Sequence, residues 1–330
     1  MPFKNSNNCN LLIFKERCMS FQHYIPAAFL ANFSSDTFEE RRKRKVSVGD
    51  KSDGSIFTAP VSKIIRIKNF YPEMVDETFE YYETRLNKAI NQLIDRTITC
   101  KLWADTLIHF VTGLLVRGPD FNERFEDRFE IAKLADVIDP ENTNFARLFE
   151  SQRLHSSIIG AKWTVLQVAE EIKLITNDLG YTPYQNPILK ELGMAIPLNP
   201  KYVLLITPRM RGKIAVSLGG VWMPIINYST LSKELASTLN RSIDEIGQRF
   251  IIGNNNEDIG KYISIQSMPR AVPEPYELGF MSGGMAMMFE HMWMKLIAVI
   301  SEPPKKDGNF IVFDFNKSYE EFIKANKGMF

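Results

Sequence analysis

The amino-acid sequence predicts an α+β fold, in which a helical N-terminal half packs on a mainly antiparallel sheet and extra elements follow at the C-terminus. Apolar residues recur three or four positions apart in much of the first half, as one buried face of a helix requires. From Lys162 onward this period gives way to short β-prone runs separated by turn residues. Helical patterns followed by strand patterns are typical of the α+β class.

The helical patterns differ in how clearly they are marked. The clearest covers residues 73–96, where six apolar residues follow the helical spacing. A short helix is expected over 26–33, because a proline in the first helical turn loses no helical hydrogen bond. Three more helices are expected in this half, over residues 102–117, 122–135 and 143–159.

The strand patterns start with Asp53-Gly54, which lies between two β-prone runs and predicts a hairpin. Ser229 is expected to cap a helix that continues to about residue 246. The remaining expected strands cover residues 162–169, 172–176, 202–207, 213–218, 249–253 and 309–315.

Composition and charge exclude several classes of protein. The chain has 330 residues, and its hydrophobic fraction of 45% and charged fraction of 24% argue against disorder or a fibrous repeat. Forty basic and thirty-nine acidic side chains give a net charge of +1, so any contact with a polyanion must be local. Three cysteines without metal-ligand spacing argue against a disulfide framework and predict a cytoplasmic protein.

The chain is expected to divide into an α+β domain over residues 1–267, with a polar N-terminal lead-in, and an accessory subdomain over 268–330. The long apolar stretch 278–300 contains Glu290 and Lys295, which favours a buried or interface helix over a membrane span. Its Met-rich part, 281–294, is expected to bind a protein partner or a second copy of the chain.

The sequence contains no phosphate-binding Gly-rich loop, no HExxH, no CxxC and no Gly-x-Ser-x-Gly elbow. Enzymes that depend on those motifs are therefore excluded. Hydrolases and nucleases that assemble scattered carboxylates and histidines in space remain.

Asp178 follows Thr176-Asn177 at the end of an expected strand, where sites are common. In partly dry surroundings its carboxylate would act as a base or a metal ligand. The alternative is an Asx turn, in which the side chain accepts hydrogen bonds from nearby backbone amides.

Glu83 lies at the edge of the buried face of the long helix, and Arg117 ends the next helix. An arginine at a helix C-terminus is well placed to bind an acid or a phosphate. The alternative is an ion pair that links the two helices.

His23 precedes the Ile25-Pro26 step, and its ordinary pKa near 6.5 suits proton transfer. The alternative is a structural histidine whose ring donates to backbone. The basic run 41–45 also has two interpretations, a solvated loop or a contact with phosphate.

Several of these residues recur, in order, in a known family. The segments are Gln22-His23-Tyr24-Ile25-Pro26, Phe29-Leu30, Phe33, Phe70-Tyr71, Glu83, Arg117-x-Pro119, Trp163, Thr176-Asn177-Asp178, Ile196-Pro197-Leu198-Asn199-Pro200 and Asn240. Over residues 20–255 the chain resembles a widespread, mainly bacterial family of unknown function numbered 4238. The resemblance implies shared polar positions at His23, Glu83, Arg117, Asp178 and Asn240, and no activity.

The chain departs from the family pattern in two places. Leu179-Gly180 stands where the family commonly has Asn-Pro, and Gly118 stands where it has Thr. The loop after Asp178 is therefore expected to bind differently.

Two functions of different classes fit these residues. The first is a hydrolase of phosphate esters in nucleic acid or nucleotides, with His23, Glu83 and Asp178 catalytic and a divalent metal ion as cofactor. Its substrate would be bound by the remaining polar residues, Arg117, Asn177 and Asn240. The second is a non-catalytic binding or sensor protein, within a bacterial defence or toxin system, in which these residues form a structural network.

Overall fold

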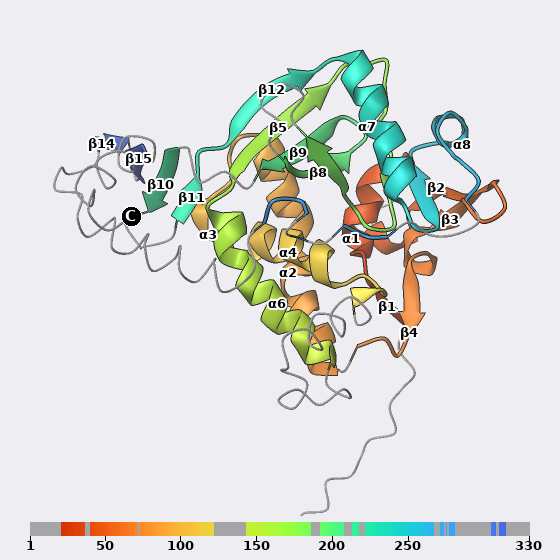
Figure 1. Cartoon of the computed structure of the whole chain (residues 1–330), viewed down its shortest axis with the longest axis horizontal. Helices are drawn as coiled ribbons and strands as arrows, with labels where there is room; N and C mark the ends of the chain where they lie inside the picture. Colours follow the sequence, from red (N-terminus) through yellow and green to blue (C-terminus); the bar gives the residue numbers. More distant parts are fainter. Residues whose placement is uncertain are drawn as a thin grey trace, which may run out of the picture.

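A computed structural model of the chain gives a mixed α+β fold (Figure 1). It describes residues 21–36, 40–71, 73–121, 143–185, 192–207, 213–217, 222–266, 271–273, 275, 277–280, 305–307 and 310–314. The helices and helical turns are α1 (Ala27–Leu30), η1 (Ala31–Phe33), η2 (Arg41–Lys43), η3 (Val61–Lys63), α2 (Glu73–Ile94), α3 (Cys100–Leu102), η4 (Trp103–Ile108), α4 (His109–Val116), α6 (Thr143–Ile159), α7 (Lys233–Ile246) and α8 (Asn256–Gly260). The strands are β1 (Phe21–His23), β2 (Lys45–Asp50), β3 (Ser55–Pro60), β4 (Arg66–Lys68), β5 (Lys162–Val168), β6 (Thr176–Asn177), β7 (Thr182–Gln185), β8 (Leu192–Asn199), β9 (Tyr202–Thr207), β10 (Lys213–Ser217), β11 (Trp222–Pro224), β12 (Asn227–Leu231), β13 (Phe250–Gly253), β14 (Lys305–Asp307) and β15 (Phe310–Asp314).

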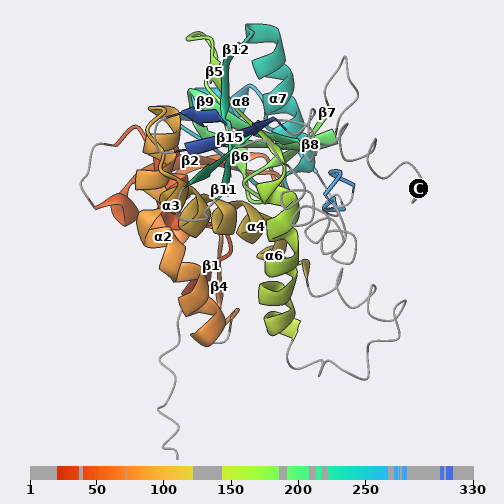
Figure 2. The same ribbon diagram turned by 90° about the vertical axis from the view of Figure 1, so that its left-hand side faces the viewer.

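The central sheet has five strands in the order β12-β5-β9-β8-β7. Only the β12–β5 pairing is parallel. Side chains alternate along β5, so that Trp163 and Val165 join the core shared with the helices, while Leu166 and Val168 join the core beneath α7. The sheet is therefore covered on both faces, with α2, α4 and α6 below it and α7 above (Figures 1 and 2).

The second sheet, in the order β3-β2-β13-β6, joins segments that are far apart in the sequence. Strands β2 and β3 form a hairpin whose turn contains Gly54 at a φ of 76°, a conformation that glycine adopts without strain. Strand β13 pairs with β2 on one side and with β6 on the other. This arrangement places the end of β6, where Asn177 and Asp178 lie, beside the N-terminal hairpin.

The helical layer forms because apolar residues recur on one face of α2 and all round α4. Helix α2 packs against η4 and α4, and α4 packs against α6. Element η4 is a π-helix between α3 and α4, so the chain from Cys100 to Val116 is one continuous helical segment.

Most of the expected elements in the described part are confirmed. The hairpin is present, and the helix expected over residues 143–159 and the strand expected over 202–207 have those bounds. The mainly helical first half is not confirmed, because strands β1 to β4 precede α2. The antiparallel pairing that the period change predicts holds for every pair of the central sheet except β12–β5.

Two expectations about local structure are wrong. The apolar run 172–176 contributes only Thr176 to a strand, because the Ile175 amide donates to the side chain of Asn240 and the Lys173 carbonyl accepts from it. Ser229 lies in β12, and the cap of α7 is Ser232, whose hydroxyl accepts a hydrogen bond from the Leu235 amide at 3.4 Å.

Some expectations lie outside the described residues, namely the helix over 122–135 and the Met-rich segment 281–294. The division of the chain at residue 267 stays a prediction. Strand β15 pairs with β10 across that boundary, and Phe280 belongs to the main core.

Candidate functional site

The first group of predicted residues meets around Arg117, which follows the last residue of α4. Its guanidinium donates to the Glu83 carboxylate at 2.5 Å, to the Tyr82 hydroxyl at 3.1 Å and to the backbone carbonyl of His23. The Tyr71 hydroxyl donates to the backbone carbonyl of Arg117 at 2.8 Å. We call these five residues the Arg117 cluster.

The local sequence explains how Arg117 is held. Gly113 lies one helical turn before it, and a Cβ at Gly113 would lie 2.5 Å from the Tyr82 hydroxyl oxygen. Only glycine lets α2 approach α4 closely enough for that hydroxyl to reach the guanidinium. The Phe79 ring lies 4.5 Å from the guanidinium carbon, which adds a cation–π contact.

Arg117 is fully buried, and so its charge needs partners. Burial by itself lowers the pKa of Arg117, but Tyr82, Glu83 and Tyr71 outweigh burial and hold it above the ordinary value. The guanidinium therefore remains a buried cation in an ion pair that links α2 to α4.

His23 contributes its backbone carbonyl to Arg117, while its ring hydrogen-bonds to the backbone of Val61. Burial lowers the pKa of His23 to about 4, helped by the nearby charges of Arg117, Arg42 and Arg66, while a hydrogen bond to the Val61 backbone opposes the shift. The imidazole is therefore neutral at pH 7. Its Nε2 atom is buried without a hydrogen-bond partner among the described residues.

A buried arginine that the sequence reasoning missed lies beside this cluster. Arg147 of α6 donates to the backbone carbonyls of Val116 at 2.6 Å and Gly118 at 2.8 Å. It thereby satisfies carbonyls at the C-terminal end of α4. Its position was readable from spacing, since Leu154 and Ile158 follow at seven and eleven residues on the same buried face.

The second group of predicted residues meets around Asp178, at the end of β6. The Asp178 carboxylate is buried and accepts hydrogen bonds from the backbone amides of Gln248, Arg249 and Phe250, at 2.8, 2.8 and 3.1 Å. Burial raises the pKa of Asp178, and these amide hydrogen bonds oppose the shift. The side chain fixes the segment that leads from α7 into β13.

Asn177 shapes the turn after β6. Its amide nitrogen donates to the carbonyls of Tyr181 and Ile243, and its oxygen accepts from the amides of Leu179 and Gly180. These contacts form an Asx-type turn at Asn177, whereas the sequence left such a turn open at Asp178.

Asn240 of α7, like Asn177, bonds to backbone groups through both polar atoms of its side chain. Its oxygen accepts from the Ile175 amide at 3.1 Å, and its nitrogen donates to the Lys173 carbonyl at 2.9 Å. Asn240 thereby replaces a neighbouring strand for this stretch of backbone, which is why residues 172–175 form no ladder.

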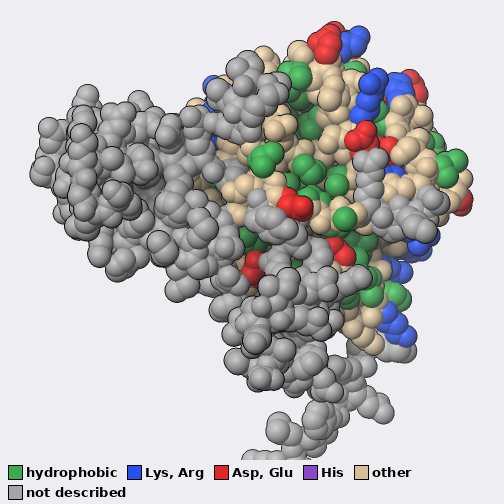
Figure 3. Space-filling view, in the orientation of Figure 1, with side chains coloured by type: hydrophobic (Ala, Val, Ile, Leu, Met, Phe, Trp, Pro, Cys, Tyr) green, Lys and Arg blue, Asp and Glu red, His purple; other side chains and the backbone are tan. Residues whose placement is uncertain are grey.

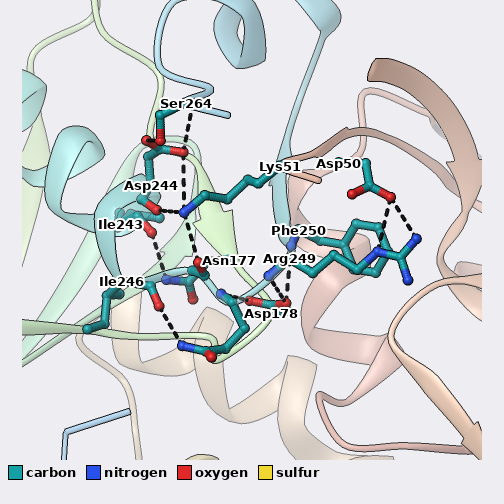
Figure 4. Close-up of polar contacts among 12 residues, drawn as sticks. Asp50, Lys51, Asn177, Asp178, Ile243, Asp244, Ile246, Arg249, Phe250 and Ser264 are labelled. Atoms are coloured by element: carbon teal, nitrogen blue, oxygen red, sulfur yellow. Dashed lines mark hydrogen bonds and ion pairs between the residues drawn. The ribbon is translucent and has the colours of Figure 1, made fainter. Parts of the chain in front are cut away.

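A buried lysine completes this group (Figure 4). Lys51 is fully buried and donates to the carbonyls of Asp244 and Gly247, while the Asp244 carboxylate lies 3.8 Å from its ammonium. Asp244 also accepts from the Ser264 hydroxyl. We call Asn177, Asp178, Asn240, Lys51 and Asp244 the Asp178 cluster.

The sequence reasoning missed Lys51 and Asp244. Asp244 follows Asn240 by one helical turn on the buried face of α7, which is a readable signal. Nothing local marks Lys51, because its partners are about 190 residues away.

Asp50 and Arg249 form an ion pair next to this cluster, and in Figure 4 Asp50 points away from Lys51. Two guanidinium nitrogens of Arg249 donate to one carboxylate oxygen at 3.0 and 2.8 Å. Burial tends to raise the pKa of Asp50, but Arg249 and Ser52 outweigh it and lower the pKa. The Arg249 side chain is 62% exposed, so this pair lies at the surface.

A family model described as protein of unknown function (DUF4238) matches residues 22–257. The chain belongs to this family. Comparisons with curated proteins and with solved structures gave no match.

Both clusters lie within the DUF4238 match. The structure places His23, Glu83 and Arg117 in the Arg117 cluster, and Asn177, Asp178 and Asn240 in the Asp178 cluster. Tyr24 is influenced by a member of each cluster: burial raises its pKa, and both Asp178 and Tyr71 reinforce the shift.

The described residues of this DUF4238 protein include no group of three or more His, Cys, Asp or Glu side chains arranged to hold a metal ion. Within the same part of the chain, no helix combines the length and apolar character needed to cross a membrane.

Proposed function

We propose that this DUF4238 protein is a non-catalytic binding protein, in which the two polar clusters hold a binding surface in shape. The observation that supports this most strongly is the environment of Asp178. A general base or metal ligand needs an oxygen that its substrate or ion can reach, whereas this carboxylate is buried and already accepts three backbone hydrogen bonds.

The other predicted residues favour the same function. Asn177 and Asn240 direct both polar atoms of their side chains to backbone groups. Glu83 pairs with Arg117, which is buried. A substrate phosphate would have to displace Glu83 to reach the guanidinium. This displacement is unfavourable, because removing one partner of a buried ion pair is costly.

A phosphate-ester hydrolase is the second candidate, and one observation favours it. His23, Glu83 and Arg117 do converge, and the neutral imidazole of His23 has an unpartnered Nε2 atom among the described residues. A neutral imidazole is the form that accepts a proton. In this hydrolase candidate, unlike the one expected from the sequence, Asp178 has no catalytic role.

An assay of turnover distinguishes the two candidates. Purified wild-type protein is incubated with Mg²⁺ or Mn²⁺ and a mixture of single-stranded DNA, RNA and nucleotides, and products are separated by mass. We expect every substrate to remain intact. Turnover that His23→Gln abolishes, with the melting temperature unchanged, would contradict the binding proposal and support the hydrolase.

A further inference from the structure

The positive charge of this chain is concentrated in one short segment. Residues 40–68 contain nine Lys or Arg and three Asp or Glu, a net charge of +6 within a chain whose total is +1. The rest of the chain is therefore acidic overall. Lys43 forms a close ion pair with Glu40. Of the other basic side chains, five are exposed, namely Arg42, Lys45, Lys63, Arg66 and Lys68, and Arg42 lies 3.7 Å from the Glu80 carboxylate at the surface.

The fold brings these cations to one side of the molecule. Turn η3 lies next to η2, since the Val61 amide donates to the Arg44 carbonyl at 2.9 Å. Strand β1 pairs with β4, with His23 opposite Arg66. Arg42 of η2 and Arg66 of β4 both lie near enough to the His23 ring to lower its pKa. Figure 3 shows Lys and Arg side chains at the lower right of the molecule, where Figure 1 draws β4.

The strand that carries two of these cations has an unusual backbone. Ile65 and Asn69, which flank β4, have φ values of 52° and 51°. A β-branched residue rarely adopts this left-handed conformation, and such residues are concentrated at functional sites. These two left-handed residues bracket the strand that pairs with β1 and carries Arg66 and Lys68.

An exposed aromatic ring lies among the cations. Phe21 is 52% exposed, it pairs with Lys68 across the β1–β4 ladder, and the Arg66 guanidinium carbon lies 4.1 Å from its ring centroid. A ring beside a guanidinium provides a stacking platform for a base, while neighbouring cations follow the phosphates.

We propose that this basic face, formed by Phe21, Arg42, Lys45, Lys63, Arg66 and Lys68, binds single-stranded nucleic acid. The inference rests on the proposed binding function and names its partner. A single strand fits better than a duplex, because a duplex keeps its bases stacked on one another and offers no free base to Phe21.

The test measures binding of the full chain to labelled twenty-nucleotide strands of DNA and of RNA by fluorescence anisotropy, over a range of salt concentrations. The strand is recovered after each titration and its length is checked. Duplex DNA, inorganic polyphosphate and vesicles containing an anionic lipid serve as competitors.

Two variants probe the face. The triple variant Lys63→Ala, Arg66→Ala, Lys68→Ala should weaken binding at least about tenfold and reduce the slope of log affinity against log salt by about 2. Phe21→Ala should weaken binding about tenfold and leave the salt slope unchanged, because stacking involves no counterion release. The charge-matched control is Lys201→Ala, Lys233→Ala, Arg241→Ala, whose side chains are exposed elsewhere, and it should bind like wild type.

Each outcome has a defined meaning. Binding to either strand with these losses supports the proposal, and a preference for RNA or DNA identifies which nucleic acid is bound. No binding, equal losses in the control variant, or stronger competition by vesicles or polyphosphate than by unlabelled strand would overturn it. Cleavage of a bound strand would contradict the non-catalytic function while leaving the surface assignment intact.

Discussion

Arg117 and Glu83 form a buried ion pair between two helices, with the guanidinium and the carboxylate 2.5 Å apart. The pair leaves 2% of the arginine side chain and 19% of the glutamate side chain exposed. It joins the C-terminal end of α4 to α2, and the same guanidinium holds the backbone of His23. One residue thereby fixes three segments of the chain.

Truncating Arg117 should destabilise the fold strongly. Arg117→Ala leaves Glu83 without its buried partner and is expected to lower the free energy of unfolding by about 3 to 5 kcal/mol, measured by urea denaturation. The matched control is Arg85→Ala, which removes a partly exposed pair at 4.0 Å between Arg85 of α2 and Asp105 of η4 and should cost under about 1 kcal/mol. Similar losses in the two variants would argue against a structural role for the Arg117 cluster.

Acid should destabilise the protein through its buried histidines. Burial lowers the pKa of His23 to about 4, and burial together with His109 lowers that of His155 to about 4, whereas an unfolded histidine has a pKa near 6.5. The unfolded chain therefore binds more protons between pH 6.5 and 4, so that stability is fully present above pH 6.5 and is lost as pH falls through this window.

Urea denaturation at pH 7 and pH 5 measures this effect. Each histidine is expected to account for about 1 to 2 kcal/mol of the loss between the two pH values. In His155→Asn the loss should be smaller by about that amount. A variant that loses as much stability as wild type would show that His155 titrates normally in the folded protein.

The turn after Asp178 should require glycine. Gly180 has a φ of 76°, and a Cβ there would lie 2.9 Å from a methyl carbon of Leu114. Gly180→Ala is therefore expected to cost about 1 to 3 kcal/mol, from backbone strain and crowding together. At Gly260 a Cβ would lie 3.7 Å from Ile56, an ordinary contact, so Gly260→Ala should be neutral or slightly stabilising when thermal unfolding of the two variants is compared.

The sequence predicted the elements with strong periodicity, and it failed where a side chain replaces a strand. Helix α6 and strand β9 follow from local patterns, because their apolar spacing agrees with their burial. The run 172–175 also has a strand pattern, but Asn240, about 65 residues later, takes the hydrogen bonds that a neighbouring strand would receive. No local pattern encodes that contact.

The residues of the candidate site could be predicted from the sequence, but their arrangement in space could not. The types and order of His23, Glu83, Arg117 and Asp178 single them out, yet their grouping into two clusters depends on how β6, α4 and β13 pack. The helix-linking ion pair of Arg117 was one of the two interpretations of that residue, whereas the Asx turn expected at Asp178 is formed by Asn177 instead. Lys51 was missed because a buried lysine is rare and its partners are distant in sequence.

The proposed function depends on a structural role for the buried Asp178 carboxylate. This role is tested by the free energy of unfolding of Asp178→Asn, compared with that of Asp53→Asn. The exposed Asp53 also accepts a backbone amide, from Ser55 at 2.8 Å, so the control changes the same chemistry at the surface. The account predicts a loss of about 2 to 4 kcal/mol for Asp178→Asn, because an amide nitrogen would face backbone donors in a buried position, and no measurable loss for the control. An Asp178→Asn variant as stable as wild type would contradict the account.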